Sequence, residues 1–510
     1  MRGRVFVTGF PPGSRSPSTL TPLARRARPD ARTHVSGTAR HSTAPRVLVA
    51  GASLPYREGV DAARPSDRTV LLVAILASFV SFLDGTVVTV ALPAIERDVG
   101  GGLATQQWVV DAYLVTLGAF ILVAGSLSDA FGRIRILRIG LLIFGVSSIA
   151  IALAPDPLTL ILLRAVQGVG GALLVPSSLA LITSHFAGAA RSRAIGTWTG
   201  ATTVATLVGP VVGGLFVDLL SWRWVFVLNV LPIALTLVLL VRGGLRDARV
   251  PGARIDIPGA ALCTIGLGAL VFALIEQPRL GWDSPAVWIA GIGGILGVVG
   301  FVLRQRVAPS PLMPLSLFSA RNFWAGNLST FFVYAALSLN GLVVAVYLQQ
   351  GAGLSATLAG LATLPPTVLM ILFSSRVGAL AGKLGPRLFM TAGPALMAVG
   401  ALLLLTVAED FDYLTQVLPG LLAFGAGLTL TVAPLTSAVL SAVPAERSGI
   451  ASAVNNAVAR VAGLVSVALL GVVVAGDLDL EGFHRAAIVT AALMAAGAVA
   501  SFAGIRDPRR

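Results

Sequence analysis

The sequence predicts an all-α integral membrane protein that crosses the bilayer fourteen times. The chain has 510 residues, of which 55% are apolar and only 12% are charged, whereas a soluble protein carries roughly a quarter charged residues. Its mean hydropathy is +0.87, and long apolar stretches recur along the chain from Thr69 onward. A chain of this composition cannot cover a water-facing surface of matching size.

Residues 1–68 differ from the rest of the chain. They hold twelve Arg residues against four acidic residues, are rich in Pro, Ser and Gly, and show no apolar helical stripe. We expect a disordered basic tail, since no apolar run of a secretory signal follows its basic start. Two readings stay open: an arm attracted to anionic lipid, or a segment that is dispensable or not translated.

The apolar stretches have about the length that a helix needs to cross a hydrocarbon core of roughly 30 Å. We expect spans at residues 70–93, 105–124, 135–154, 158–183, 195–217, 223–241, 258–276, 286–303, 324–348, 357–377, 388–407, 414–440, 449–475 and 484–504. These spans leave no room for a soluble catalytic domain, so the chain is not expected to be an enzyme.

The charges between the predicted spans indicate the orientation. With the N-terminus inside, the inner segments after Arg68 hold nineteen Arg or Lys residues, and the outer segments hold only Arg97, Arg223, Arg279 and Arg485. An excess of basic residues on the cytoplasmic side is typical of membrane proteins. An odd number of spans would scramble this pattern. We therefore expect a multi-pass protein of the plasma membrane with both termini in the cytoplasm.

A repeat divides the membrane part into halves. Gly125 and Gly132 follow the second span, Gly378 and Gly385 follow the tenth, and basic residues come directly after each pair. This spacing predicts two six-helix bundles, residues 69–243 and 307–505, joined by two linker helices in residues 244–306, with 506–510 as a cytoplasmic tail. Halves of this kind, related by an axis along the membrane normal, occur in transporters, and their substrate site lies between them near the midplane.

Five motifs in chain order resemble those of one protein family. They are Leu83-Asp84-Gly-Thr86-Val-Val-Thr89-Val-Ala-Leu92-Pro93, Gly125-Ser-Leu-Ser-Asp129-Ala-Phe-Gly132-Arg133, Arg164-Ala-Val-Gln167-Gly168-Val-Gly170-Gly171-Ala172 with Pro176, Gly209-Pro210-Val-Val-Gly213-Gly214, and Ser221-Trp222-Arg223-Trp224-Val-Phe226 with Asn229. Over about residues 69–505 the chain is similar to the major facilitator superfamily, specifically to its fourteen-span drug:proton antiporters of the EmrB/QacA kind. It departs from their usual pattern at Thr89, Ala130, Ile134 and Ala205.

The resemblance implies a major facilitator fold and the export of hydrophobic or amphipathic compounds in exchange for protons. It assigns gating to the inner turn with Gly125, Asp129, Gly132 and Arg133, and it assigns the antiporter motif to Gly209, Pro210, Gly213 and Gly214. Gly209 and Gly213 would let two helices approach closely, and Pro210 would bend the span. The alternatives are plain tight packing at the glycines and a plain topology anchor at the inner turn.

Ionisable residues inside the predicted spans are the candidates for proton coupling. A carboxylate such as Asp84 costs about 2.5 to 3.5 kcal/mol at mid-span unless it is protonated, paired or facing water. Asp84 is the first candidate and Asp111 the second, and Arg164 could tune either of them or simply hold two helices together. Arg460, which follows Asn455 and Asn456, could bind substrate or belong to a packed polar network.

The remaining predictions concern ligands and partners. Further substrate contacts are expected from Tyr113, Trp198, Phe331, Tyr334, Asn340 and Tyr347. A single cysteine and four scattered histidines predict no metal site, and we expect no cofactor, no nucleic-acid partner and a monomer in the lipid bilayer. A proton-coupled symporter of the same fold and a non-transporting membrane sensor are the alternative functions.

Overall fold

The computed structural model describes residues 66–510 except residues 246, 248–255, 445–446, 476–477 and 508–510. All regular secondary structure in this part of the chain is helical. The predicted basic tail therefore lies outside the described residues, apart from 66–68.

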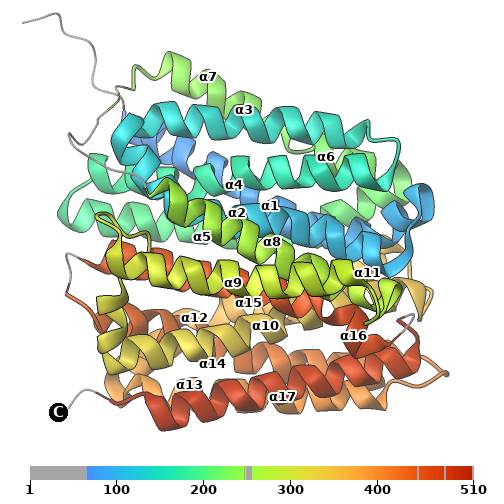
Figure 1. The fold of residues 1–510 in the computed structure, drawn as a ribbon. Helices are drawn as coiled ribbons and strands as arrows, with labels where there is room; N and C mark the ends of the chain where they lie inside the picture. Colours follow the sequence, from blue (N-terminus) through green and yellow to red (C-terminus); the bar gives the residue numbers. More distant parts are fainter. Residues whose placement is uncertain (1–65, 246, 248–255, 445–446, 476–477, 508–510) are drawn as a thin grey trace, which may run out of the picture. The chain divides into compact units, whose positions relative to one another are not determined.

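The first group of helices runs from blue to green in Figure 1. It comprises α1 (Asp67–Val99), α2 (Gly102–Phe131), α3 (Arg133–Ala152), α4 (Pro157–His185), α5 (Gly188–Leu219), α6 (Arg223–Val227) and α7 (Val230–Arg242). The sixth predicted span is thus built from α6 and α7, with Asn229 at the junction.

The rest of the chain forms two further helices and then a second group. The two helices are α8 (Ile257–Leu280) and α9 (Pro285–Val307), followed by the short 3₁₀ helix η1 (Leu315–Ser319). The second group comprises α10 (Arg321–Gln350), α11 (Ala356–Ala362), α12 (Pro365–Leu384), α13 (Pro386–Leu403), η2 (Leu404–Thr406), η3 (Tyr413–Val417), α14 (Leu418–Ser441), α15 (Ser448–Ala468), α16 (Leu470–Val474) and α17 (Leu480–Gly504).

Thirteen helical segments among the described residues are long and apolar enough to cross a membrane. Their positions match thirteen of the fourteen predicted spans. The segment outside this set is α2, a helix of 30 residues at the place of the second predicted span. The predicted all-helical membrane fold is therefore confirmed, and the predicted number of spans agrees closely with the structure.

Polar side chains cap the starts of several of these helices. Ser66, Asp156 and Asp479 each accept a hydrogen bond from a backbone N–H of the turn that follows, at the start of α1, α4 and α17. Such caps satisfy N–H groups that have no partner inside the helix. At the start of α4, the hydroxyl and backbone N–H of Thr159 hold the pKa of Asp156 below its ordinary value, so this cap stays ionised.

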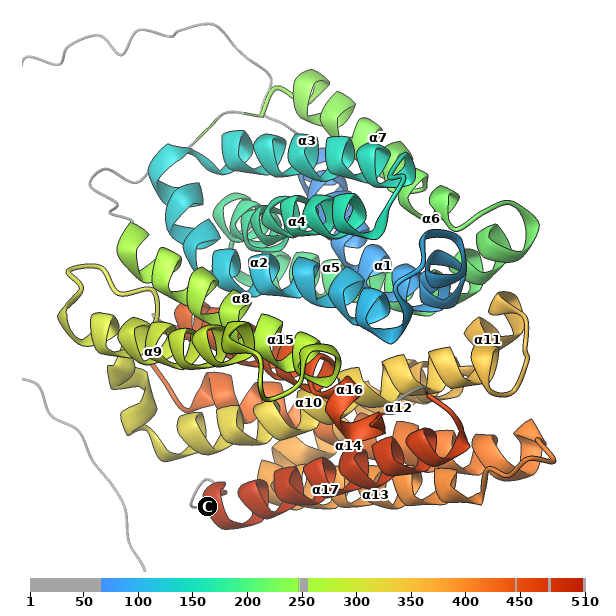
Figure 2. The ribbon, with the colours of Figure 1, turned by 45° about the vertical axis from the view of Figure 1, so that its right-hand side comes forward.

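The two groups of helices pack in equivalent ways. In the first group α1 packs against α4 and α5, and α4 also packs against α2 and α3; in the second group α10 packs against α14 and α15, and α14 also packs against α12 and α13. Helix α8 contacts α2 as well as α15 and α16, and α9 packs on α8 (Figure 2). The two linker helices therefore lie against the junction of the two groups and outside each of them.

We call the end of the bundle with the start of α1 and the end of α17 the inner end, and the opposite end the outer end. At the outer end one apolar cluster unites side chains of both groups, among them Val87 and Leu92 of α1 with Leu342 and Val346 of α10. At the inner end the clusters are separate, one around Val73 and Leu137 and another around Phe323 and Met390. A further apolar cluster joins Ala119 of α2 to Leu464 of α15 beside α8, so away from the linker helices the apolar contact between the two groups is concentrated at the outer end.

The two inner turns of the sequence repeat have the same geometry. Gly132 and Gly385 have φ angles of +103° and +95°, in the left-handed region that favours glycine. In the first turn the Asp247 carboxylate accepts hydrogen bonds from the backbone N–H groups of Ile134 and Arg135, at 2.9 and 3.1 Å. In the second turn the Asp507 carboxylate accepts one from the backbone N–H of Arg387, at 3.0 Å. Each half thus ends on an aspartate that caps the third helix of that half.

Candidate functional site

A buried ion pair lies in the first group of helices. The Arg164 Nη1 atom of α4 is 2.7 Å from the Asp84 Oδ2 atom of α1, and the two side chains are 2% and 0% exposed. The Arg164 Nε–H also donates to the Val109 carbonyl oxygen of α2, at 2.9 Å. Because an unpaired charge at this depth is very costly, each side chain of the pair compensates the other.

Two amides complete the surroundings of Asp84. The side-chain N–H groups of Gln167 and Asn229 donate to its Oδ1 atom, at 3.3 and 3.1 Å. Gln167 also accepts from Arg164 Nη1 at 2.5 Å and donates to the Ser148 hydroxyl at 2.8 Å. Both amides lie in the sequence motifs, which assign them no role. Gln167 lies three residues after Arg164, on the same helical face, and this spacing could have indicated its contact with the pair.

Tyr113 of α2 lies against the Asp84–Arg164 ion pair. The Arg164 guanidinium carbon is 4.4 Å from the centroid of its ring, within the range of a cation–π contact. The Tyr113 hydroxyl forms a 3.1 Å hydrogen bond with the Ser81 hydroxyl of α1. Helices α1, α2 and α4 are thereby connected around the pair, and the sequence-predicted residues Asp84, Tyr113 and Arg164 are brought together.

Asp111 has very different surroundings, although it is as deeply buried as Asp84. Its side chain is 0% exposed, and neither carboxyl oxygen has a hydrogen-bond partner among the described residues. One turn earlier on α2, the side-chain N–H of Gln107 donates to the carbonyl oxygens of Val467 and Ala468. Asp111 therefore belongs to the contact between the two groups of helices, apart from the Arg164 pair.

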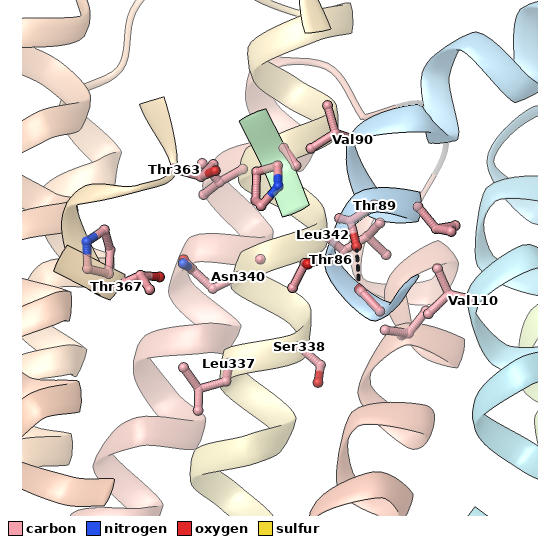
Figure 3. A pocket seen from close by; sticks show the side chains of 18 of the residues that line it. Thr86, Thr89, Val90, Val110, Leu337, Ser338, Asn340, Leu342, Thr363 and Thr367 are labelled. Carbon is pink, nitrogen blue, oxygen red and sulfur yellow. Dashed lines mark hydrogen bonds between the residues drawn. The ribbon is translucent and has the colours of Figure 1, made fainter. Parts of the chain in front are cut away.

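A cavity of about 370 Å³ lies between the two groups of helices. Its walls come from α1, α2, α4 and α5 on one side and from α10, α12, α14 and α15 on the other. Five sequence-predicted residues line it: Tyr113, Arg164, Pro210, Asn340 and Arg460. Its Ser and Thr residues are Thr86, Thr89, Ser338, Thr363 and Thr367 (Figure 3), of which only Thr86 and Thr89 belong to a sequence motif. Hydroxyl groups on apolar helices carry no distinct sequence signal, because most of them bond to their own helix.

The other residues predicted to contact substrate lie elsewhere. Trp198 donates a 3.0 Å hydrogen bond to the Ser78 hydroxyl, and Phe331 and Tyr334 are not among the residues that line the cavity. Tyr347 stacks on Phe483 with ring centroids 4.2 Å apart and lines a separate polar space at the outer end.

Asn455 and Asn456, neighbours on α15, differ from each other. The Asn455 amide donates to Asn327 and Thr330 of α10, at 3.2 and 2.7 Å. The Asn456 side chain is exposed and donates to the Ser452 carbonyl oxygen of its own helix. Asn455 thus belongs to a packed polar network, and Arg460 alone of this group reaches the cavity.

The glycines of the Gly209–Gly214 motif lie in close contacts at the outer half of α5. A Cβ atom at Gly213 would lie 3.0 Å from the Val87 carbonyl oxygen of α1, and one at Gly214 would lie 2.6 Å from the Ala356 carbonyl oxygen of α11. Gly360 of α11 packs equally closely against the Pro210 backbone. Only hydrogen in place of a side chain allows the helices to approach this far.

Hydrogen bonds between the two groups reinforce this outer contact. The Asp218 carboxylate of α5 accepts from the backbone N–H groups of Ala356 and Thr357, at 3.1 and 2.8 Å. The Gln349 side chain of α10 donates to the Val90 carbonyl oxygen of α1, at 3.0 Å. The outer end of the cavity is therefore closed by packed glycines and by polar contacts together.

The inner-turn residues are placed by the capped turn described above. Gly125 has no neighbouring atom within 4 Å of a Cβ position, and Arg133 is the first residue of α3. The side chain of Asp129 lies outside the part of the chain that the structure describes.

Comparison with known proteins places this architecture in a family. The family described as the Major Facilitator Superfamily matches residues 74–467. The chain is 36% identical to the multidrug resistance protein Stp of Mycobacterium tuberculosis, covering 81% of this chain and 77% of that protein. It is 36% identical to a puromycin resistance protein of Streptomyces alboniger, covering 80% and 81%. It is 33% identical to a tetracenomycin C resistance and export protein of Streptomyces glaucescens, covering 80% and 76%.

Solved structures show the same fold at much lower sequence identity. A peptide transporter in complex with sulfate superposes with a TM-score of 0.64 at 15% identity, covering 86% of this chain and 94% of that chain. A D-xylose-proton symporter superposes with a TM-score of 0.62 at 16% identity, covering 86% and 98%. The family match, the resistance transporters and the multi-pass helical fold agree, and the chain therefore belongs to the drug-efflux transporters of the Major Facilitator Superfamily.

Proposed function

We propose that this protein exports hydrophobic or amphipathic compounds across the plasma membrane in exchange for protons, by alternating access of its two helix groups. The observation that carries this proposal is the buried Asp84–Arg164 pair beside a cavity between the groups. The cavity is closed at its outer end. The excess of basic residues on the inner segments supports cytoplasmic termini, so the outer end would face away from the cytoplasm.

The ion pair offers a physical means of coupling. In the present state Asp84 pairs with Arg164 and accepts hydrogen bonds from two amides. When the outer contact opens, a proton that neutralises Asp84 would release Arg164 from it, and the two states would differ in their affinity for the proton. Asp111, buried without a partner among the described residues, is a second candidate proton carrier, because an isolated buried carboxylate is very costly.

The driving force is large enough for useful efflux. One proton moving down about 100 mV supplies about 2.3 kcal/mol, and every 1.4 kcal/mol corresponds to a factor of about ten in concentration. One net charge per cycle would therefore sustain a gradient of roughly fortyfold. The name of one relative suggests the first compound to test, tetracenomycin C.

The test is transport by purified protein in liposomes with an imposed pH gradient. We expect wild-type protein to move tetracenomycin C against the direction of proton flow. Asp84→Asn should reduce gradient-driven accumulation at least tenfold but preserve exchange of labelled for unlabelled compound across the membrane, because exchange needs no net proton transfer. Asp283→Asn, at an exposed outer position, is the matched control and should behave like wild type.

The outcomes separate the possible functions. Accumulation in the same direction as the protons would make the protein a symporter, and an unchanged gradient-driven rate in Asp84→Asn would exclude coupling through Asp84. A panel of antibiotics in an efflux-deficient host then identifies the physiological class of compound. The protein should sediment as a monomer in detergent and should not bind nucleic acid.

A further inference from the structure

The charges around the central cavity do not balance. Its described lining residues include Arg164 and Arg460 but no Asp or Glu. The charge of Arg164 is neutralised by Asp84, which is buried behind it. The cavity therefore has one uncompensated positive charge, on Arg460.

Arg460 has no hydrogen-bond or ion-pair partner among the described residues. Its side chain is half-buried on α15, a helix that spans the membrane. Its Cβ atom lies 3.6 Å from the Cβ position of Gly118 on α2, and its charge acts on the phenol groups of Tyr113 and Tyr334. A phenol is a weak acceptor and carries no charge at neutral pH, so neither ring compensates the guanidinium.

A guanidinium at this depth requires an acceptor. Arginine inside a membrane pairs with an acidic group or a carbonyl, or lines a water-filled space. Its planar fork of N–H groups matches a carboxylate or phosphate and binds it through two parallel hydrogen bonds. Because no described residue supplies such a group to Arg460, the cavity is built to receive one.

The remaining walls define the rest of the ligand. Apolar side chains surround the cavity on both sides, with Leu337, Leu421, Phe424, Leu428 and Val467 among them. The volume of about 370 Å³ lies within the range of sites for drug-sized molecules.

We propose that the cargo of this transporter is an amphipathic organic anion whose acidic group binds Arg460 and whose apolar body packs against these walls. This inference rests on the proposed function and narrows it: cationic compounds are disfavoured cargo because they would meet an uncompensated positive charge in the cavity.

Equilibrium binding tests the inference without any gradient. Purified protein in nanodiscs of phosphatidylcholine is titrated with three pyrene probes of equal size: pyrenebutyrate, pyrenebutanamide and pyrenebutylamine. Empty nanodiscs correct for partition into lipid. We expect the acid to bind at least tenfold more tightly than the amide, and the amine to bind most weakly. If the wild-type protein shows this order of affinities but no proton-driven transport, the proposed function is contradicted and the anion site at Arg460 still stands.

Variants assign the effect to Arg460. Arg460→Gln should abolish the preference for the acid and leave the affinity for the amide unchanged, and Arg460→Lys should keep most of the preference. Arg306→Gln is the matched control, because Arg306 is exposed at the inner end of α9, and it should behave like wild type.

Three results would overturn the inference: equal affinity of wild type for acid and amide, tighter binding of the amine, or an equal loss of all three probes in both Arg460→Gln and Arg460→Lys. Adding phosphatidylglycerol to the nanodiscs distinguishes the source of the anion. Competition with pyrenebutyrate would support an anion site that lipid headgroups occupy, and no competition would support a free organic acid.

Discussion

At the scale of single residues, the charged groups inside the membrane differ in how their charge is compensated. Asp84 and Asp111 are equally buried, yet one is held by a cation and two amides and the other has no described partner. Arg164 and Arg460 show the same contrast on the cationic side. Sequence position identifies such residues as costly and therefore as candidates for function, but only the tertiary structure shows which neighbours compensate each charge.

The energetic coupling of Asp84 and Arg164 is testable. Asp84→Asn and Arg164→Gln should each destabilise the protein by about 3 to 5 kcal/mol, because each leaves the other charge buried and uncompensated. The double variant should be much more stable than the sum of the two losses implies. Thermal unfolding of the purified variants in detergent measures this.

An exposed ion pair serves as the control for this cycle. Asp98 and Arg223 form an ion pair with side chains 46% and 37% exposed, and such pairs contribute about 0 to 1 kcal/mol. Asp98→Asn should therefore barely change the unfolding temperature. Strictly additive effects of Asp84→Asn and Arg164→Gln would show that the buried charges do not stabilise each other.

At the scale of helices, the outer contact between α5 and α11 determines which side of the cavity is closed. Gly214 and Gly360 bring the two helix backbones together, and Asp218 caps the start of α11. The same motif was recognisable in the sequence as a bend with small residues. Its partner helix was not, because no periodicity within α5 specifies what lies against it.

Two glycine substitutions in α5 should distinguish closure of the outer end of the cavity from the stability of the helix. Gly214→Ala places a Cβ atom 2.6 Å from the Ala356 carbonyl oxygen, so the helices must move apart and transport should fall at least tenfold. Gly200→Ala on the same helix meets no atom within 4 Å and should leave transport intact while stabilising α5 by about 0.4 to 1 kcal/mol. Spin-label distances between the outer ends of α5 and α11 report the separation directly, and an unchanged distance in Gly214→Ala would refute the seal.

At the scale of the whole molecule, the two halves repeat one plan. In each half a glycine with positive φ begins the third helix, and an aspartate that follows the last helix caps its N–H groups. The glycine spacing predicted the repeat. Nothing in the sequence indicated the roles of Asp247 and Asp507, since each is more than a hundred residues along the chain from the N–H groups that donate to it.

Equivalent caps should have equivalent effects. Asp247→Ala and Asp507→Ala should each lower the free energy of unfolding by about 1 kcal/mol, the usual contribution of a helix cap, and the two losses should add because the sites are separate. Thermal unfolding measures both. A loss in only one variant would mean that the two turns are structurally alike but not energetically equivalent.

The amino-acid sequence by itself determined that the protein is helical and spans the membrane about fourteen times, and it predicted two related halves. These properties follow from local hydropathy, helix length and charge, which each segment carries within itself. Only the tertiary structure decided that Gln167 and Asn229 serve Asp84, that Asp111 lies apart from Arg164, and that Arg460 faces the cavity without a protein partner among the described residues. Those relations depend on which helix faces which, and inside a membrane nearly every helix face is apolar, so the pattern of a single helix cannot specify its neighbour.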